Sequence, residues 1–330
     1  MFDVYGLGNA LVDMEYRVDE GFLTRHQIAK GHMTLVDEQR IDALMEDLHE
    51  YTPERMSGGS AANTIIAAQY FGTSNYYSCK VAGDETGNFF LSDLQAAGVG
   101  SNGDSTAGEG KSGHCLVLVT PDAERSMNTF LGISSNLSVS EIDESALAQA
   151  RYFYVEGYLS SSSNSRDAAI ACRELAERSG VKTVVSLSDP SMVEFFREDM
   201  EKILGNGVQH LFCNEEEALA WAKTDRLDIA LKELKDVAES LNVTLGSRGS
   251  LAVGPHAQHE APGYPVTAVD TNGAGDIYAG ASLFGWCNGM SAEQAAAFGN
   301  FAAASLVQSF GARFRQAGDY QQVLEQFRNA

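Results

Sequence analysis

Positive charge is what this sequence has little of. Its 330 residues include 23 lysines and arginines against 45 aspartates and glutamates, which gives a formal net charge of −22. Such an excess of negative charge repels polyanions, and it argues against a nucleic-acid polymer or an anionic membrane surface as a partner. Because charged residues make up 21% of the chain and hydrophobic residues 44%, the composition is still that of a protein with a sizeable core.

Long apolar runs and paired cysteines are also absent. No run approaches the roughly 20 apolar residues needed to span a bilayer. With Asp3 near its start and Arg17 as its first basic residue, the N-terminus lacks the pattern of a secretory signal. The five cysteines are far apart, without a Cys-x-x-Cys pair of the kind used for zinc or redox chemistry. These absences predict a cytoplasmic protein with buried free thiols.

No linker rich in proline or glycine and no internal repeat divides the chain, so residues 1–330 are expected to form one domain. Short apolar runs alternate with amphipathic helical patterns, including a helix expected over Leu227–Leu241 and another over Ala292–Gln308. This alternation predicts an α/β fold with a mostly parallel sheet flanked by helices. The expected strands are Val4–Leu7, Tyr76–Val81, Cys115–Val119, Tyr152–Val155, Thr183–Leu187, His210–Cys213 and Val243–Leu245.

Two segments, near residues 11–36 and 112–132, break this rhythm. Both contain alternating extended stretches, and the second is interrupted by the turn signature Thr120-Pro121-Asp122. We expect them to form a small β-sheet lid inserted into the larger domain. The pattern fits extra edge strands on the main sheet equally well.

Glycine is abundant and clustered, above all between Asp270 and Gly280. This stretch follows an extended run, Tyr264–Val269, and opens a helix expected to reach about Cys287. Backbone N–H groups crowded at a helix N-terminus stabilise negative charge. Asp276 would lie in the first turn, near enough to take a proton from an attacking hydroxyl. The alternative is that Asp276 only caps the helix.

Five motifs together resemble a known family. Asp-Thr-Asn-Gly-Ala-Gly-Asp at 270–276 is similar to the C-terminal signature of the ribokinase-like (PfkB) carbohydrate and nucleoside kinases, and Gly-Gly-Ser-Ala-Ala-Asn-Thr at 58–64 to the N-terminal one. Similar motifs stand at 6–13, 214–218 and 244–249, so the resemblance extends over nearly the whole chain. Within the family, the details most resemble adenosine kinases, although inosine-guanosine kinases share part of the set. The resemblance implies a doubly wound ribokinase-like fold.

The resemblance also implies roles for residues at the reacting end of a site. Asp276 would deprotonate the sugar 5′-hydroxyl, and the backbone of 273–276, including Gly273, Ala274 and Gly275, would form an anion hole. Asp13 suits two adjacent ribose hydroxyls, since an ionised carboxylate only accepts hydrogen bonds; its alternative role is a turn cap. The implied substrate-binding set is Asn9, Leu11, Asp13, Gly58, Gly59, Ser60 and Asn63.

For the nucleotide, the resemblance implies ATP with Mg²⁺. Glu217 would hold the Mg²⁺ through water, because this ion keeps much of its hydration shell. The implied nucleotide-binding set is Asn214, Glu217, Thr244, Gly246, Gly249 and Asn300. Asn214 also has the residue type and acidic context of a helix cap, and both roles are compatible.

Two further residues carry alternatives. Arg125 is a candidate for stabilising the transferring phosphoryl group, or a solvated arginine of the lid. The resemblance implies that Asp270 could bind a monovalent cation such as K⁺, but Asn272 replaces the threonine of the ribokinase version. Potassium dependence is therefore left open.

The sequence thus predicts an ATP- and Mg²⁺-dependent kinase of small molecules, with adenosine, converted to AMP, as the first substrate candidate. Inosine or guanosine, or a sugar such as ribose or fructose, are alternative substrates, and a non-catalytic nucleoside-binding regulator is a rival of another class. A monomer and a homodimer are both compatible with the sequence.

Overall fold

The computed structural model describes residues 1–103, 107–122 and 124–329, and it contains two sheets. The larger has eight strands in the order β13-β12-β11-β10-β9-β8-β1-β5. Neighbouring strands from β5 to β11 are parallel, and β12 and β13 are antiparallel additions at one edge. The predicted α/β fold with a mostly parallel sheet is confirmed. The strands are β1 (Phe2–Leu7), β5 (Asn75–Ser78), β8 (Ala150–Glu156), β9 (Lys182–Ser186), β10 (His210–Asn214), β11 (Leu241–Thr244), β12 (Gly249–Val253) and β13 (Gln258–Pro262).

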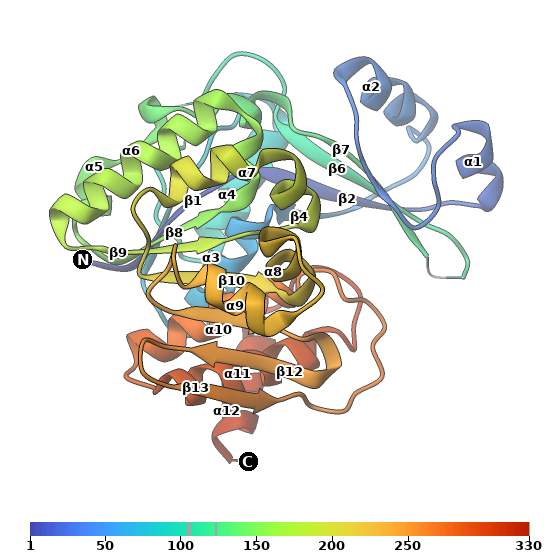
Figure 1. Ribbon diagram of the computed structural model, residues 1–330. Coiled ribbons are helices and arrows are strands. Elements are labelled where there is room, and N and C mark those ends of the chain that lie inside the picture. The colour runs from blue at the N-terminus through green and yellow to red at the C-terminus, as the bar shows by residue number, and fades with distance from the viewer. Residues whose placement is uncertain (104–106, 123, 330) are drawn as a thin grey trace.

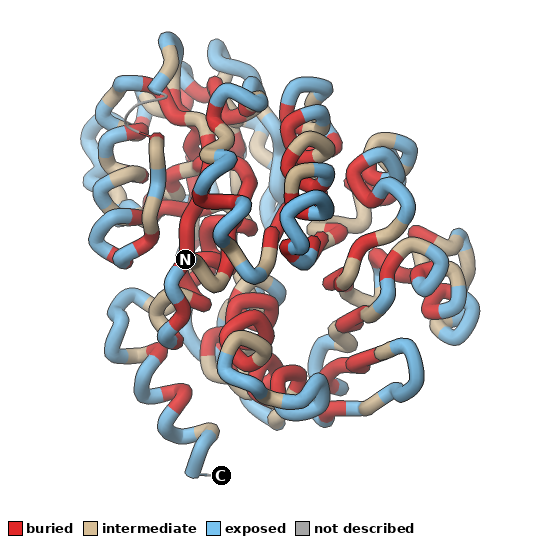
Figure 2. Tube along the Cα trace, turned by 90° about the vertical axis from the view of Figure 1, so that its left-hand side faces the viewer, coloured by how far each residue is buried: buried red, intermediate tan, exposed pale blue. Residues whose placement is uncertain are grey.

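Helices cover both faces of this sheet, because alternate residues of its buried strands point to opposite sides. Phe153 and Val155 pack with residues of one helical layer, whereas Tyr154 between them packs with residues of the other. The first layer comprises α5 (Glu144–Ala148), α6 (Ser163–Ser179), α7 (Pro190–Leu204), α8 (Glu215–Ala222) and α9 (Leu227–Leu234). The second comprises α3 (Ser60–Phe71), α10 (Ala274–Cys287), α11 (Ala292–Leu306) and α12 (Ala317–Asn329). Buried positions follow the strands and the helix sides that face them (Figure 2).

The smaller sheet projects from this body (Figure 1) and has five strands in the order β3-β7-β6-β2-β4. They are β2 (Leu11–Arg17), β3 (Met33–Leu35), β4 (Glu54–Gly58), β6 (Gly113–Val119) and β7 (Arg125–Phe130). Two helices, α1 (Glu20–Arg25) and α2 (Glu38–Asp47), cover its outer face through Val12, Met14, Phe22 and Ile41. The helix α4 (Glu85–Ala96) packs against β2, β4 and β6. The sheet thus contains both segments expected for a lid, together with β4, which lies outside them; Ala123 of the second segment is outside the described residues.

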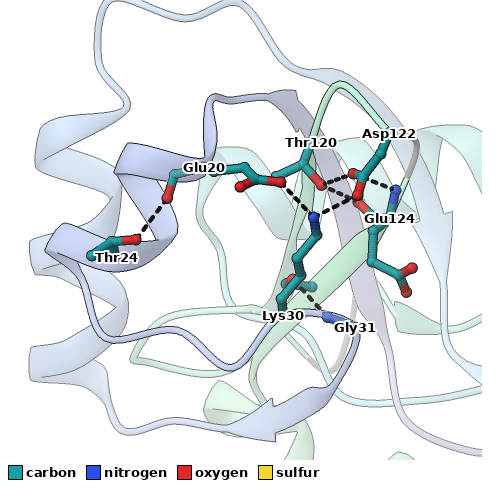
Figure 3. Close-up of polar contacts among 8 residues, drawn as sticks. Glu20, Thr24, Lys30, Gly31, Thr120, Asp122 and Glu124 are labelled. Atoms are coloured by element: carbon teal, nitrogen blue, oxygen red, sulfur yellow. Dashed lines mark hydrogen bonds and ion pairs between the residues drawn. The ribbon is translucent and has the colours of Figure 1, made fainter.

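Near the tip of this sheet, two ion pairs of Lys30 join the segment that follows β2 to the connection between β6 and β7 (Figure 3). Lys30 Nζ contacts Glu20 Oε1 at 2.7 Å and Asp122 Oδ2 at 2.5 Å. The Thr120 hydroxyl donates to Asp122 Oδ1 at 2.7 Å, so the predicted turn is closed by its own side chains. The segment that carries α1 is therefore fastened to the connection between β6 and β7.

The run Tyr264–Val269, expected to be extended, lies outside both sheets; at its end, Val269 donates from its backbone to the Val307 carbonyl at 2.7 Å. One expectation about local structure was wrong. The helix expected to reach Leu241 ends at Leu234, because Leu241 and Val243 belong to β11 and pair with Leu211 and Cys213 of β10. In the part of the chain that the structure describes, no helix has both the length and the hydropathy to cross a bilayer.

Candidate active site

A cavity of about 580 Å³ opens at the carboxyl ends of the parallel strands. Asn9, Glu156, Asn214 and Thr244 line it from the ends of, or just beyond, β1, β8, β10 and β11. The N-termini of α3 and α10 also reach it, and the inner face of the smaller sheet forms another wall. Ligands of open α/β sheets bind at this edge. The cavity is therefore the candidate active site.

Asp276 lies in the first turn of α10 and is held by two side chains of α3. Ser60 Oγ donates to Oδ1 at 2.7 Å, and Asn63 Nδ2 donates to Oδ2 at 3.0 Å. Burial raises the pKa of Asp276 to about 6, and the two hydrogen bonds oppose that increase. The carboxylate is therefore fixed in the cavity, and it is ionised at neutral pH while more basic than an ordinary aspartate.

The turn before α10 depends on Gly273, which is the N-cap of the helix and has φ = 74°. A Cβ on this residue would lie 2.1 Å from the Ala312 carbonyl oxygen, so only glycine fits. The N–H groups of the first helical turn have no acceptor within the helix. Ala274 N–H contacts the Thr271 carbonyl at 3.3 Å, but the structure records no such turn bond for Gly275 or Asp276. Residues 273–276 all line the cavity, and these N–H groups can receive an anion there.

Asp13, on β2 of the smaller sheet, lines the cavity on another side. Its carboxyl group packs against Gly58, and a Cβ at that glycine would lie 2.6 Å from Oδ2. The lack of a side chain at Gly58 therefore leaves space for the Asp13 carboxylate, although Gly58 itself does not line the cavity. Burial raises the pKa of Asp13 to about 6, while the positive charges of Arg313 and Arg125 act in the opposite direction. Gly59, the N-cap of α3, has φ = 97° and brings its backbone against that of Asn9.

Glu156 is a residue of the cavity that the sequence motifs do not reveal. Its side chain is 1% exposed; Oε1 accepts the Asn9 N–H and Oε2 the Ala61 N–H, each at 2.7 Å. One carboxylate thus joins the segment after β1 to the start of α3. Burial raises the pKa of Glu156 to about 7, against the effect of both hydrogen bonds.

At the other end of the cavity, Asn214 and Glu217 form a reciprocal cap of α8. The Asn214 side chain accepts the Glu217 N–H at 2.8 Å, and Glu217 accepts the backbone N–H and the Nδ2 of Asn214 at 3.0 and 2.7 Å. Both residues line the cavity with Thr244, Gly246 and a further acid, Asp189. The pKa of Glu217 rises to about 7, chiefly through burial and in part through Asp189.

Two residues expected at the nucleotide do not line the cavity in this structure. Asn300 donates to the carbonyl oxygens of Ala261 and Pro262 at 2.9 and 3.3 Å. Gly249, with φ = 99°, packs under the Ala261 carbonyl. Both therefore support the end of β13, and neither lines the cavity.

Arg125 and Asp270 also lie outside the main cavity and contact each other. Arg125 forms an ion pair with Glu15 on β2 and another with Asp270, whose Oδ2 is 3.0 Å from Nη1. Arg125 lines a second cavity of about 400 Å³, which shares Asp13 with the first. Arg313, another residue without a sequence signal, lines this second cavity and donates to Asp93 and to Ser57.

Tyr16, Phe130 and Tyr158 are aromatic residues whose types would suit stacking on a base, and of these three only Tyr158 lines the main cavity in the described structure. Tyr16 packs beneath α1 and α2, and Phe130 contacts His114. The described residues include no cluster of three or more histidines, cysteines or acids arranged to enclose a metal ion.

The fold and this site define a phosphotransferase that acts on a hydroxyl group, and comparisons with known proteins identify the family. The model of the pfkB family carbohydrate kinases matches residues 32–317, and the chain belongs to this family. A crystal structure of adenosine kinase from Sinorhizobium meliloti is 33% identical, with a TM-score of 0.88 and coverage of 98% of this chain and 99% of that one. A probable sugar kinase from Rhizobium etli is 30% identical, with a TM-score of 0.88 over 99% of both chains. Adenosine kinase 2 of Arabidopsis thaliana is 26% identical over 96% of each sequence.

Proposed function

We propose that this protein is an ATP-dependent nucleoside kinase that phosphorylates the 5′-hydroxyl of ribose, and that it converts adenosine to AMP. One observation supports this more than any other. A basic carboxylate at a helix N-terminus, Asp276, shares a cavity with a second carboxylate, Asp13, suited to a vicinal diol. The adenosine kinases among the similar proteins favour the nucleoside.

In this proposal, Asp13 accepts hydrogen bonds from the ribose 2′- and 3′-hydroxyls and so directs the 5′-hydroxyl toward Asp276. Asp276 takes the proton as the oxygen attacks the γ-phosphorus of ATP, while the bond from that phosphorus to the β,γ-bridging oxygen breaks and ADP leaves. The free N–H groups at the start of α10 stabilise the charge on the transferring phosphoryl group. Ser60 and Asn63 keep the base oriented throughout.

The phosphate end of the cavity fits a nucleotide that carries Mg²⁺. The oxygen donors of Asn214 and Glu217 suit this ion, and because Glu217 already accepts two hydrogen bonds from Asn214, contact through water is the natural mode. Bound with the nucleotide, Mg²⁺ supplies neutralisation of phosphate charge. Thr244 and Gly246 lie on the same side and border the nucleotide.

The wall formed by the smaller sheet supports a nucleoside over a free sugar as the substrate. Met33 and Leu35 on β3 are 43% and 54% exposed, and with Met127 and Leu131 they line the cavity. A nucleobase would cover this apolar surface, whereas a free sugar would leave it in water. We infer that the smaller sheet acts as a lid that closes on the base and excludes water from phosphoryl transfer.

A sugar kinase is the second candidate, because the Rhizobium etli relative is named as one. The test is ADP release with adenosine, inosine, guanosine, cytidine, ribose and fructose as acceptors. We expect kcat/KM for adenosine to exceed that for ribose by on the order of 100-fold, which corresponds to burial of one apolar ring. A preference for ribose or fructose would make the protein a sugar kinase. ADP release with none of the acceptors, alongside nucleoside binding in calorimetry, would indicate a regulator.

A further inference from the structure

The guanidinium group of Arg125 is held on three sides. It forms ion pairs with Glu15 and with Asp270, and it lies over the ring of Phe310, with Cζ 5.5 Å from the ring centroid. The exposed fractions of the side chains of Arg125 and Asp270 are only 12% and 9%. The positive charge is therefore fixed beside Asp270 in a largely desolvated position.

Asp270 in turn organises the loops on both sides of the anion hole. Its Oδ1 accepts the Asn272 N–H at 3.0 Å, and its Oδ2 accepts the Gly311 N–H at 2.9 Å. Asn272 directly precedes Gly273, and Gly311 directly precedes Ala312, whose carbonyl packs against Gly273. The geometry of the turn that opens α10 consequently depends on a charged Asp270 with its partners in place.

The family resemblance implies a possible monovalent cation at Asp270, but the residues present here do not fit one. The two oxygens of Asp270 already accept three donors, namely two backbone N–H groups and the guanidinium of Arg125. The carbonyl of Val307, which lies beside the same loop, accepts the N–H groups of both Val269 and Asp270. A K⁺ ion at Asp270 would have to displace Arg125 or share its carboxylate with a like charge.

We propose that Arg125 is a positioning residue that neutralises Asp270 in place of a monovalent cation, so that this kinase works without K⁺. The proposal rests on the phosphotransfer function above. Arg125 acts through Asp270 on the loop 270–273. The geometry of the anion hole therefore depends on Arg125. The side chain belongs to β7 of the smaller sheet, so the same contact also joins that sheet to the anion-hole loop.

The first experiment is a cation series on the complete protein. Phosphoryl transfer is measured in buffers whose only added monovalent cation is choline, Na⁺ or K⁺, each at about 100 mM so that screening is equal. We expect activities within about twofold of one another. Activation by K⁺ of about tenfold or more would overturn the proposal.

The second experiment removes the positive charge of Arg125. Arg125→Met should lower kcat, and free guanidinium ion should restore activity by about tenfold, whereas equal choline should not. The double variant Arg125→Met/Asp270→Asn should lose less than the two single variants predict together, because neutralising Asp270 removes the need for its partner. Arg226→Met, at an exposed arginine paired with Asp228, is the matched control and should respond to neither ion. Absence of rescue together with additive effects would overturn the proposal.

A third measurement does not depend on activity. Binding of Tl⁺, a spectroscopic substitute for K⁺, is followed by thallium NMR on the wild-type protein, with K⁺ as competitor. We expect no K⁺-competable signal, and such a signal that disappeared in Asp270→Asn would overturn the proposal. A protein that phosphorylated no acceptor would instead refute the proposed function, and the thallium measurement would still decide whether a monovalent cation binds at Asp270.

Discussion

The carboxylate of Asp276 owes its position to side chains of another helix. Ser60 and Asn63 match motif positions expected to bind the sugar, yet in this structure they donate to Asp276. Their hydrogen bonds favour the ionised carboxylate, while burial disfavours it more strongly, and the pKa of about 6 results from both. Such a group is ionised at neutral pH and still accepts a proton more readily than an exposed aspartate.

The change Asp276→Asn tests the base directly. An amide has nearly the same shape and can still accept the hydroxyl of Ser60, so adenosine and ATP should still bind. Turnover should fall at least about 100-fold, the lower end of a general-base contribution. Steady-state kinetics give kcat, and calorimetry gives the two dissociation constants. Asp228→Asn, at an exposed acid that does not line the cavity, is the control and should retain the turnover of the wild type; near-normal kcat in Asp276→Asn would remove this residue from the mechanism.

The sequence pointed to the residues that belong to continuous motifs, and it missed those whose role arises only in three dimensions. Asp276 was predicted from the glycine-rich run before a helix, and Asp13 from its motif. Glu156 is one acid at the end of an apolar strand, and no local pattern distinguishes it from a solvated residue. Its partners, Asn9 and Ala61, are far from it in the sequence.

The turn into α10 tolerates no side chain at its first residue. At Gly273, φ is 74° and a Cβ would lie 2.1 Å from a backbone oxygen, whereas at Gly275 a Cβ would meet no atom within 4 Å. Gly273→Ala should therefore destabilise the protein by about 1–3 kcal/mol, the usual cost of a strained backbone position. Gly275→Ala is the matched control, and its free energy of unfolding should equal or exceed that of the wild type. Urea unfolding compares them; equal stability of the two variants would contradict the assigned role of Gly273.

Glu156 connects the end of β8 to the start of α3 and to the segment after β1. In Glu156→Gln, one carboxylate oxygen is replaced by an NH₂ group, which leaves one buried backbone N–H without an acceptor. The cost should be about 1–3 kcal/mol of stability, together with a higher KM for the nucleoside, because Asn9 and Gly59 lose their fixed positions. Glu54→Gln, at an exposed acid of the smaller sheet that pairs with Arg315, controls for the loss of one negative charge. An unchanged KM for the nucleoside in Glu156→Gln would show that this connection does not shape the sugar site.

Helices with a clear start were predicted better than segments whose partners lie elsewhere. The helix α10 ends at Cys287, as its small and apolar residues indicated. By contrast, Leu227–Leu241 has one continuous helical pattern, but pairing with β10 draws Leu241 and Val243 into the sheet. The residues of Tyr264–Val269 indicate an extended backbone. Whether a partner strand lies beside this segment depends on distant parts of the chain, so the local sequence does not predict it.

The excess of negative charge in this protein, −22 overall, extends to the main cavity, where the proposed function requires phosphate to bind. The described residues that line it include five acids, Asp13, Glu156, Asp189, Glu217 and Asp276, and no lysine or arginine. Under the proposed function, phosphate recognition therefore depends on backbone N–H groups at helix N-termini and on Mg²⁺ carried by the nucleotide. These act at hydrogen-bond range, whereas distant surface charges are screened within about 8 Å at physiological salt.

Because these acids lie in a desolvated cavity, activity and stability should change with pH in opposite directions. Burial raises the pKa of Asp13 and Asp276 to about 6, and of Glu156 and Glu217 to about 7, from ordinary values of 3.8 and 4.5. Between those values the folded protein binds protons that the unfolded chain does not, so the free energy of unfolding should fall as pH rises through this window. Over the same window kcat/KM should rise, about tenfold per pH unit below pH 6, because Asp276 must be ionised to accept a proton.

Calorimetry of the ligand-free protein should therefore give a higher Tm at pH 6 than at pH 8, and the lower net charge at pH 6 acts in the same direction. Acids with lowered pKa values, such as Asp84 and Asp93, titrate below this window. Burial also lowers the pKa of His114 and of His210, so the unfolded chain binds their protons near pH 6 and these two groups act against the trend of the four acids. The variant Asp276→Asn, which lacks one of the raised groups, should show a smaller decrease in Tm between the two pH values. Because the histidines contribute equally to the wild type and to this variant, an equal change in Tm in the two proteins would show that Asp276 is not desolvated in the folded protein, and the basicity assigned to Asp276 would then have no physical cause.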